Sequence, residues 1–148
     1  MPRVLRRSDL ANPTTPIVCV DLNGVLDGYT GWKHSEHWDP PRSGAAEFLA
    51  GLAGSGFDVV VFTTRHRVGV RRWLREHGLL QWVSAITDRK PPAHVFVDDR
   101  AVCFRGDFAA TLEQVRAFTA HWEEAAANQP ASSARARARK RVRRASKR

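Results

Sequence analysis

The fold of this chain is decided by residues 17–27, which read Ile17-Val18-Cys19-Val20-Asp21-Leu22-Asn23-Gly24-Val25-Leu26-Asp27. Apolar, mostly β-branched residues run directly into a carboxylate, a pattern typical of a strand buried on both faces in the middle of a parallel sheet. Such sheets bind ligands at the carboxyl ends of their strands, where Asp21 stands, and Gly24 lets the chain turn sharply away. A carboxylate in that place either caps the following turn or is paired, bound to a metal or used as a nucleophile.

The composition indicates one domain with a single core and a separate basic tail. The chain has 148 residues, of which 43% are hydrophobic. Its fifteen acidic residues all precede residue 128, as do fifteen of its twenty-four basic residues, so the net charge of +9 belongs to residues 128–148. We expect a cytoplasmic protein, because the N-terminus does not resemble a signal peptide and no apolar run reaches membrane-spanning length. Cys19 and Cys103 lack metal-ligand spacing, and we expect both to be buried, reduced thiols.

Strand and helix patterns alternate along the rest of the chain. We expect an irregular lead-in over residues 1–16 and a polar, aromatic loop over about residues 24–42. The predicted strands cover residues 17–20, 59–62, 82–86 and 94–97. The first predicted helix is capped by Ser43 and ended by Gly54 and Gly56, and its apolar face carries Ala45, Phe48, Leu49 and Leu52. The second is ended by Gly78 and has Val70, Trp73, Leu74 and His77 on one face. The third covers about 108–127, with Leu112, Val115, Phe118 and Trp122 inward.

This alternation predicts an α/β fold: a single Rossmann-like, three-layer domain with a central parallel sheet and right-handed crossovers. The domain spans residues 17–127, and residues 128–148 form a disordered tail. We expect a monomer or a weak dimer.

The polar residues that matter follow the predicted strands. Asp21, Thr63 and the pair Asp98-Asp99 stand at strand ends, and Lys90 lies in the loop before the last strand. In a parallel sheet all these ends lie on one edge, so we expect the side chains to converge. An all-oxygen cluster suits Mg²⁺, and a metal, a Lys and a Thr beside a carboxylate suit a phosphoryl group. Taken alone, Thr63 is explained equally well as a strand-end cap, and Lys90 is explained better as a solvated loop lysine.

Together these motifs resemble those of the haloacid dehalogenase (HAD) superfamily of phosphotransferases, over roughly residues 17–125. The first motif of that family, Asp-x-Asp-Gly-x-Leu after an apolar strand, corresponds to Asp21-Leu22-Asn23-Gly24-Val25-Leu26. The second, third and fourth motifs correspond to Thr63, Lys90 and Asp98-Asp99 in the same order. Receiver domains use similar residues but phosphorylate an Asp on a later strand.

The resemblance implies a role for each of these residues. Asp21 would attack phosphorus to form an aspartyl-phosphate, Thr63 would bind the phosphoryl oxygens, and Lys90 would offset their charge. Mg²⁺ would be held by the Asp21 carboxylate, the backbone carbonyl of Asn23 and Asp98. Asp99 would act through water or orient Lys90, although Asp98 and Asp99 are interchangeable in these roles.

One position departs from the family. Asn23 stands where members carry the Asp that protonates the leaving group, an assistance worth about 10²–10⁴-fold. The site is therefore expected to be slow on alkyl phosphates, or to recruit Asp27, His34 or His37, or to bind phosphate compounds without turnover.

No cap domain is present between the motifs, which is typical of family members with bulky substrates. We expect the substrate to contact Thr64, Arg65, Trp32 and His34. Trp32, Trp38 and Tyr29 would either form a stacking wall for a base or sugar, or anchor the 24–42 loop to the domain.

The tail carries Arg or Lys at nine positions within residues 135–148. Such a run either binds polyanions, nucleic acid first, or only increases solubility. The sequence thus predicts a Mg²⁺-dependent phosphatase acting on a phosphorylated substrate, such as a nucleotide or a nucleic-acid end. The alternative is a catalytically impaired HAD fold that binds nucleic acid or phosphorylated ligands.

Overall fold

A computed structural model describes residues 3–128 of the chain. The basic tail lies outside the described residues. The elements in chain order are α1 (Arg7–Ala11), β1 (Ile17–Asp21), η1 (Leu22–Leu26), α2 (Ala45–Gly54), β2 (Asp58–Phe62), α3 (Arg67–Glu76), η2 (Leu80–Trp82), β3 (Ala85–Thr87), β4 (Val95–Val97), α4 (Phe108–Arg116) and α5 (His121–Ala127).

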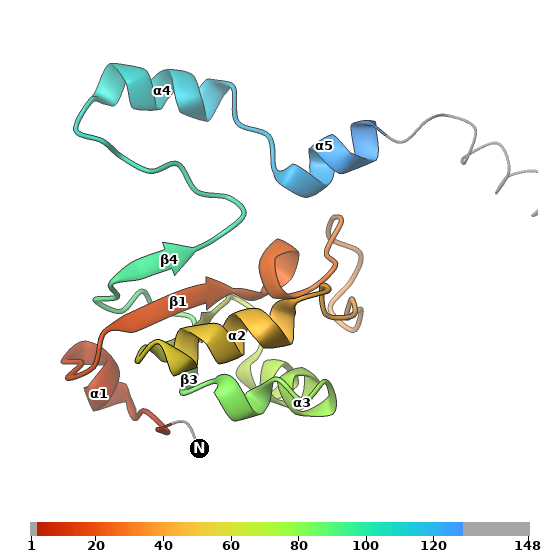
Figure 1. Cartoon of the computed structure of the whole chain (residues 1–148). Helices are drawn as coiled ribbons and strands as arrows, with labels where there is room; N and C mark the ends of the chain where they lie inside the picture. Colours follow the sequence, from red (N-terminus) through yellow and green to blue (C-terminus); the bar gives the residue numbers. More distant parts are fainter. Residues whose placement is uncertain (1–2, 129–148) are drawn as a thin grey trace, which may run out of the picture.

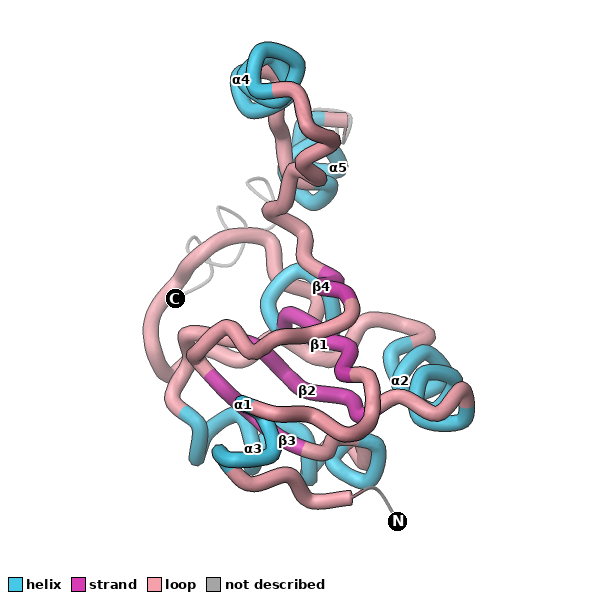
Figure 2. Tube along the Cα trace, turned by 90° about the vertical axis from the view of Figure 1, so that its left-hand side faces the viewer, coloured by secondary structure: helices cyan, strands magenta, loops and turns pink. Residues whose placement is uncertain are grey.

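The centre of the molecule is the parallel four-stranded sheet predicted from the sequence, with strand order β3-β2-β1-β4 (Figures 1 and 2). The register pairs Val20 with Val61 on one side and with Val97 on the other, so β1 is an inner strand. From β1 the chain proceeds outward through β2 to β3 and then crosses to β4 on the opposite side. The carboxyl ends of β1 and β4 therefore flank a topological switch point, where α/β sheets bind their ligands.

The main core lies between one face of the sheet and the helices α2 and α3. The inward side chains of β1 and β2 on this face pack with Leu49 of α2 and with Val70 and Leu74 of α3, all fully buried. This agrees with the predicted apolar faces, except that His77 is exposed at the end of α3 and Phe48 is 39% exposed on α2. Helix α2 begins after Gly44, which has a left-handed φ of 86°, and Ser43 is not its N-cap.

The opposite face of the sheet is covered by the N-terminal segment. The prediction of an irregular lead-in over residues 1–16 was wrong in part, because residues 7–11 form α1. Leu5 is buried on this face beside Ile17, Cys19 and Val60, and Leu10 packs against the same cluster.

The prediction of one inward-facing helix over 108–127 was wrong. The segment forms two helices, separated at Ala120, whose extended ψ of 144° interrupts the helical geometry. Figure 1 shows α4 standing away from the sheet, and its expected core residues are exposed: Leu112 by 49%, Val115 by 57% and Phe118, just after it, by 41%. Trp122 is buried, but in contacts near the carboxyl end of β1. The apolar face predicted for residues 108–118 therefore has no partner on the sheet.

Three smaller expectations also changed. Residues 80–82 form a 3₁₀ turn, so the third strand is confined to Ala85–Thr87. Cys19 is buried as predicted, whereas Cys103 is exposed because the 98–107 connection leaves the body of the domain. Between residues 3 and 128, no helix combines the length and the apolar character needed to cross a membrane.

Candidate active site

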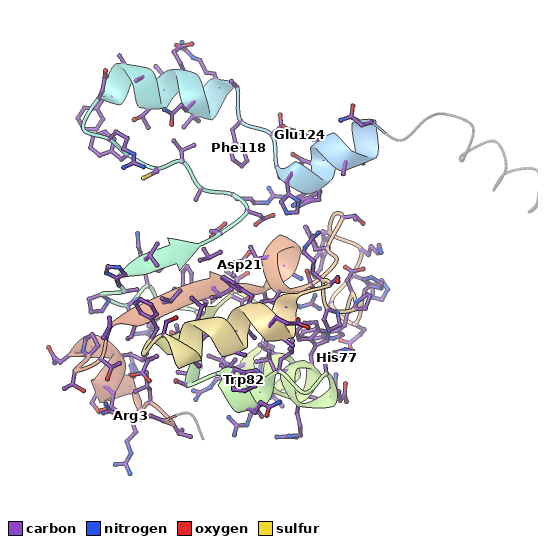
Figure 3. The ribbon with its side chains drawn as sticks, in the orientation of Figure 1. Arg3, Asp21, His77, Trp82, Phe118 and Glu124 are labelled. Carbon is purple, nitrogen blue, oxygen red and sulfur yellow. The ribbon has the colours of Figure 1, made fainter. Side chains whose placement is uncertain are left out.

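Three carboxylates from two neighbouring strand ends meet at the switch point. Asp21 ends β1, Asp98 and Asp99 follow β4, and one oxygen of each lies within 4.8 Å of the others. Asp21 lies at the end of β1 that faces α5 (Figure 3). The three carboxylates line a cleft of about 320 Å³ together with Asn23, Thr63 and Arg100 among others. The convergence predicted from the strand ends is confirmed for Asp21, Thr63, Asp98 and Asp99.

The cluster has the donor chemistry of a site for a hard divalent cation. Its ligand atoms are all oxygens, which suit Mg²⁺ better than softer metals. None of the ion pairs among residues 3–128 involves Asp21, Asp98 or Asp99. Three carboxylates this close repel one another unless a cation joins them, so a Mg²⁺ ion fits the residues present.

The pKa of Asp21 is raised mainly because the carboxyl group is largely buried. Burial and, to a smaller extent, the charges of Asp98 and Asp99 raise the pKa of Asp21 to about 7, against the lowering effect of a hydrogen bond from the Leu22 amide. A bound cation would lower this pKa and keep the carboxylate ionised, as a nucleophile requires.

The turn after β1 brings the cluster close to the backbone at Gly24. Gly24 has a φ of 87°, and a Cβ there would lie 2.3 Å from Asp99 Oδ2. Only glycine combines this left-handed backbone with room for the carboxylate. The glycine expected for a sharp turn is therefore also required by the close approach of Asp99.

Asn23 is held by a buried carboxylate beneath the turn. Its amide Nδ2 donates to Asp27 Oδ2 at 2.6 Å, while Asp27 Oδ1 accepts from the Gly24 and Tyr29 amides at 2.9 and 3.1 Å. Asp27 is only 1% exposed, and burial raises its pKa although the three donors oppose the shift. Asp27 thus shapes the turn through Asn23 and two backbone amides.

Helix α5 supplies contacts that the sequence did not predict for the site. Trp122 Nε1 donates to Asp99 Oδ2 at 2.5 Å, and His121 Nε2 lies 2.7 Å from the Gly24 carbonyl oxygen. The indole of Trp122 also meets the ring of Tyr29 edge-on at 5.1 Å and lies beneath the Arg100 guanidinium. The only sequence signal for these roles was the inward position predicted for Trp122, and nothing in the spacing assigned it to Asp99.

The residues after β2 form the wall of the cleft opposite the acidic pair. Thr63 is buried, and its Oγ1 accepts from the Arg65 amide at 3.2 Å. Thr64 is exposed on the same wall. The guanidinium of Arg65 donates to the carbonyl oxygens of Ser35 and His37, both at 2.8 Å, and stacks on Trp38 at 3.8 Å. Arg65 therefore lines the cleft and fastens the 24–42 loop.

The two interpretations of the loop aromatics apply to different residues. Trp38 anchors the loop, since it stacks under Arg65 and its ring occupies the space where a Cβ on Gly69 would lie. Trp32 lines the cleft and is 67% exposed, which leaves its face free for a ligand. His34 does not line the cleft; it packs edge-on against His37, which itself bonds to Asp39 at 2.9 Å.

Lys90, like His34, is a predicted site residue that does not line the carboxylate cleft. Its ammonium lies 4.8 Å from the centre of the Phe96 ring, and it lines a second cleft rather than the one that holds Asp21. The loop of residues 88–94 that carries it has no helix or strand to fix its course, which explains why order in the sequence did not predict its position.

Comparisons with known proteins identify no family for the chain. No family model and no curated protein matches it. Among solved structures, it is similar to a conserved protein from Bacteroides thetaiotaomicron, with 20% identity over 68% of this chain and 89% of that one and a TM-score of 0.48. It is also similar to an uncharacterized protein from Listeria monocytogenes serotype 4b, with 18% identity, a TM-score of 0.43 and coverage of 48% of this chain and 45% of that one. This chain thus spans less than half of the Listeria protein.

Proposed function

We propose that the protein is a Mg²⁺-dependent phosphohydrolase of the HAD type that acts through an aspartyl-phosphate on Asp21. The observation that carries the proposal is the meeting of Asp21, Asp98 and Asp99 within 4.8 Å at the switch point. A bound Mg²⁺ would neutralise charge on the phosphoryl group, and Asp21, Asn23, Asp98 and Asp99 would hold it.

The reaction would proceed in two displacements at phosphorus. A carboxylate oxygen of Asp21 forms a bond to phosphorus while the bond to the leaving oxygen breaks, and the leaving group takes its proton from water. Water then attacks the phosphorus of the aspartyl-phosphate, releases phosphate and restores Asp21. The Thr63 wall of the cleft would face the phosphoryl oxygens. No carboxylic acid stands at position 23 to assist either proton transfer.

A second candidate function is favoured by two observations. The Asn23 amide is already bonded to Asp27, and Lys90 lies away from the carboxylates. A site without an acid–base group and without its lysine would bind phosphorylated ligands and turn them over poorly or not at all.

Hydrolysis of an aryl phosphate and of a phosphorylated oligonucleotide, with Mg²⁺ and with EDTA, tests the proposal. We expect Mg²⁺-dependent phosphate release by the wild type and by the control Glu36→Gln, which removes an exposed carboxylate that does not line the carboxylate cleft. Asp21→Asn should reduce release to background while its melting temperature stays close to that of the wild type. Phosphate release that persists in Asp21→Asn would show that Asp21 is not the nucleophile. Absence of release by the wild type, with Mg²⁺-dependent binding of the same compounds, would select the binding function.

A further inference from the structure

A second cleft, of about 610 Å³, adjoins the carboxylate cleft and is strongly basic. Its walls come from three separate segments: the N-terminal segment with α1, the turn from β2 into α3, and residues 85–92. Each segment contributes two cationic side chains, and the only acidic residue in the lining is Asp88. The cations are Arg6, Arg7, Arg65, Arg67, Arg89 and Lys90.

These positive charges have no acidic partners in the part of the chain that the structure describes. The ion pairs among residues 3–128 use Arg3, Lys33, His37 and Arg116, and none of the six cations of the cleft. Arg65 is engaged with backbone carbonyls, and the other five side chains are exposed. Since residues 1–127 are formally neutral, this concentration of charge is local, and a cleft lined by one sign of charge attracts the opposite one.

The two clefts share a wall. Thr63, Thr64 and Arg65 line both, so the two clefts meet at these residues. A ligand with a phosphoryl group at Asp21 would therefore extend its remaining anionic groups along the arginines. This geometry favours a chain of phosphates over an isolated phosphate.

The lining of the basic cleft also has an apolar part. Leu10 and Ala85 are half-buried residues of the lining and Pro92 is exposed, so apolar surface faces the cleft. Inorganic polyphosphate has no groups that gain from such a surface. A nucleic-acid strand has them, because sugars and bases alternate with phosphates, and arginine stacks on bases as well as binding phosphates.

We propose that this basic cleft binds a strand of single-stranded nucleic acid whose terminal phosphate reaches Asp21. The placement of the terminal phosphate rests on the proposed function, whereas binding of the strand does not. The binding surface belongs to the folded domain and is additional to any contribution from the basic tail.

Binding of a fluorescein-labelled oligothymidylate of about ten nucleotides, phosphorylated at its free end, tests the proposal by fluorescence anisotropy. The cleft variant is the full chain with Arg7→Glu and Arg89→Glu, which reverse one positive charge on each of two walls of the basic cleft. The control is Arg72→Glu with Arg75→Glu, which reverses the same number of exposed charges on α3 outside both clefts. Two versions of this oligonucleotide are used, one with the phosphate at the 5′ end and one with it at the 3′ end, and the affinity for each is measured.

We expect the cleft variant to bind at least about tenfold more weakly than the control, for two lost charge-assisted contacts. The slope of log K against log salt should fall by roughly 0.7 for each contact. Melting temperatures of the two variants should agree within a few degrees. Equal binding by the two variants would overturn the proposal, as would tighter binding of inorganic polyphosphate than of the oligonucleotide at equal phosphate concentration.

Hydrolysis separates this proposal from the proposed function. Where the wild type releases phosphate, the cleft variant should lose activity on the phosphorylated oligonucleotide and keep its activity on an aryl phosphate. An equal loss on both substrates would overturn the placement of the strand. Where the wild type releases no phosphate but the anisotropy difference is present, the phosphohydrolase proposal fails and the nucleic-acid site stands.

Discussion

Replacing Asp98 by Asn should stabilise the metal-free protein and abolish its response to Mg²⁺. Asn keeps the oxygen that accepts from the Arg100 amide at 2.7 Å but removes one of the clustered negative charges. Two carboxylates 4.8 Å apart, the limit within which the cluster lies, repel by about 1 kcal/mol in a water-like dielectric and by about 3 kcal/mol at an effective dielectric constant of 20. Because Asp98 is exposed, the lower figure applies, and the melting temperature should rise by about 4 °C.

The size of this gain should depend on pH through Asp21. The pKa of Asp21 is about 7 in the folded protein and about 3.9 in an unfolded chain. The folded state therefore binds more protons between these values, and the stability of the metal-free protein falls as pH rises from about 4 to about 7. At pH 5 Asp21 is protonated and repels Asp98 less, so the rise in melting temperature caused by Asp98→Asn should be smaller at pH 5 than at pH 8.

Thermal unfolding in EDTA and in Mg²⁺, at pH 5 and pH 8, measures both effects. Mg²⁺ at about ten times its Kd should add about 1.4 kcal/mol to the unfolding free energy of the wild type at pH 8. Asp98→Asn should lose most of this increment, while Glu36→Gln should keep it. The reasoning is refuted by an unchanged or lower melting temperature of Asp98→Asn in EDTA at pH 8, or by equal stabilisation of both variants by Mg²⁺.

Three further substitutions test the turn and α5. Asn23→Asp should raise turnover of an alkyl phosphate by about 10–10⁴-fold. It should also destabilise the fold above neutral pH, because it places a second carboxyl group beside buried Asp27. Background rates in both the wild type and the variant would contradict the explanation that the site lacks only a proton donor. Asp27→Ala should lower the unfolding free energy in urea by about 2–4 kcal/mol, since two backbone donors and the Asn23 amide lose their acceptor; a loss under 1 kcal/mol would contradict that role. Trp122→Phe keeps an aromatic ring but removes the donor to Asp99, so Mg²⁺ titrations should give a Kd about tenfold weaker, and an unchanged Kd would show that Asp99 needs no such positioning.

The parts of the site that the sequence predicted are those fixed by the sheet. Apolar runs set the strands at β1, β2 and β4, and parallel pairing then forces Asp21, Thr63 and Asp98 to one edge. The buried faces of α2 and α3 followed in the same way from residues such as Leu49 and Val70.

The parts that the sequence did not predict lie on segments without such a constraint. Lys90 lies in an irregular loop, where order along the chain says nothing about direction. Helix α4 has an apolar face that the sheet does not cover, so periodicity alone predicted the wrong burial for Leu112 and Val115. The contact of Trp122 with Asp99 joins two segments outside the sheet, and no local pattern encodes it.

The contact between His121 and Gly24 also has a consequence for the order in which the protein acquires its parts. These two residues are 97 positions apart, so the first motif is synthesised long before the helix that packs on it. At about 5–20 residues per second, the interval on the ribosome is about 5–20 s. Every buried residue of the main core precedes residue 87, so we expect β1 to pair with β2 during this interval. The partners of Asp99 and of the Gly24 carbonyl on α5 are synthesised only at its end. The nascent domain should therefore become resistant to protease before it acquires a fully positioned carboxylate cluster.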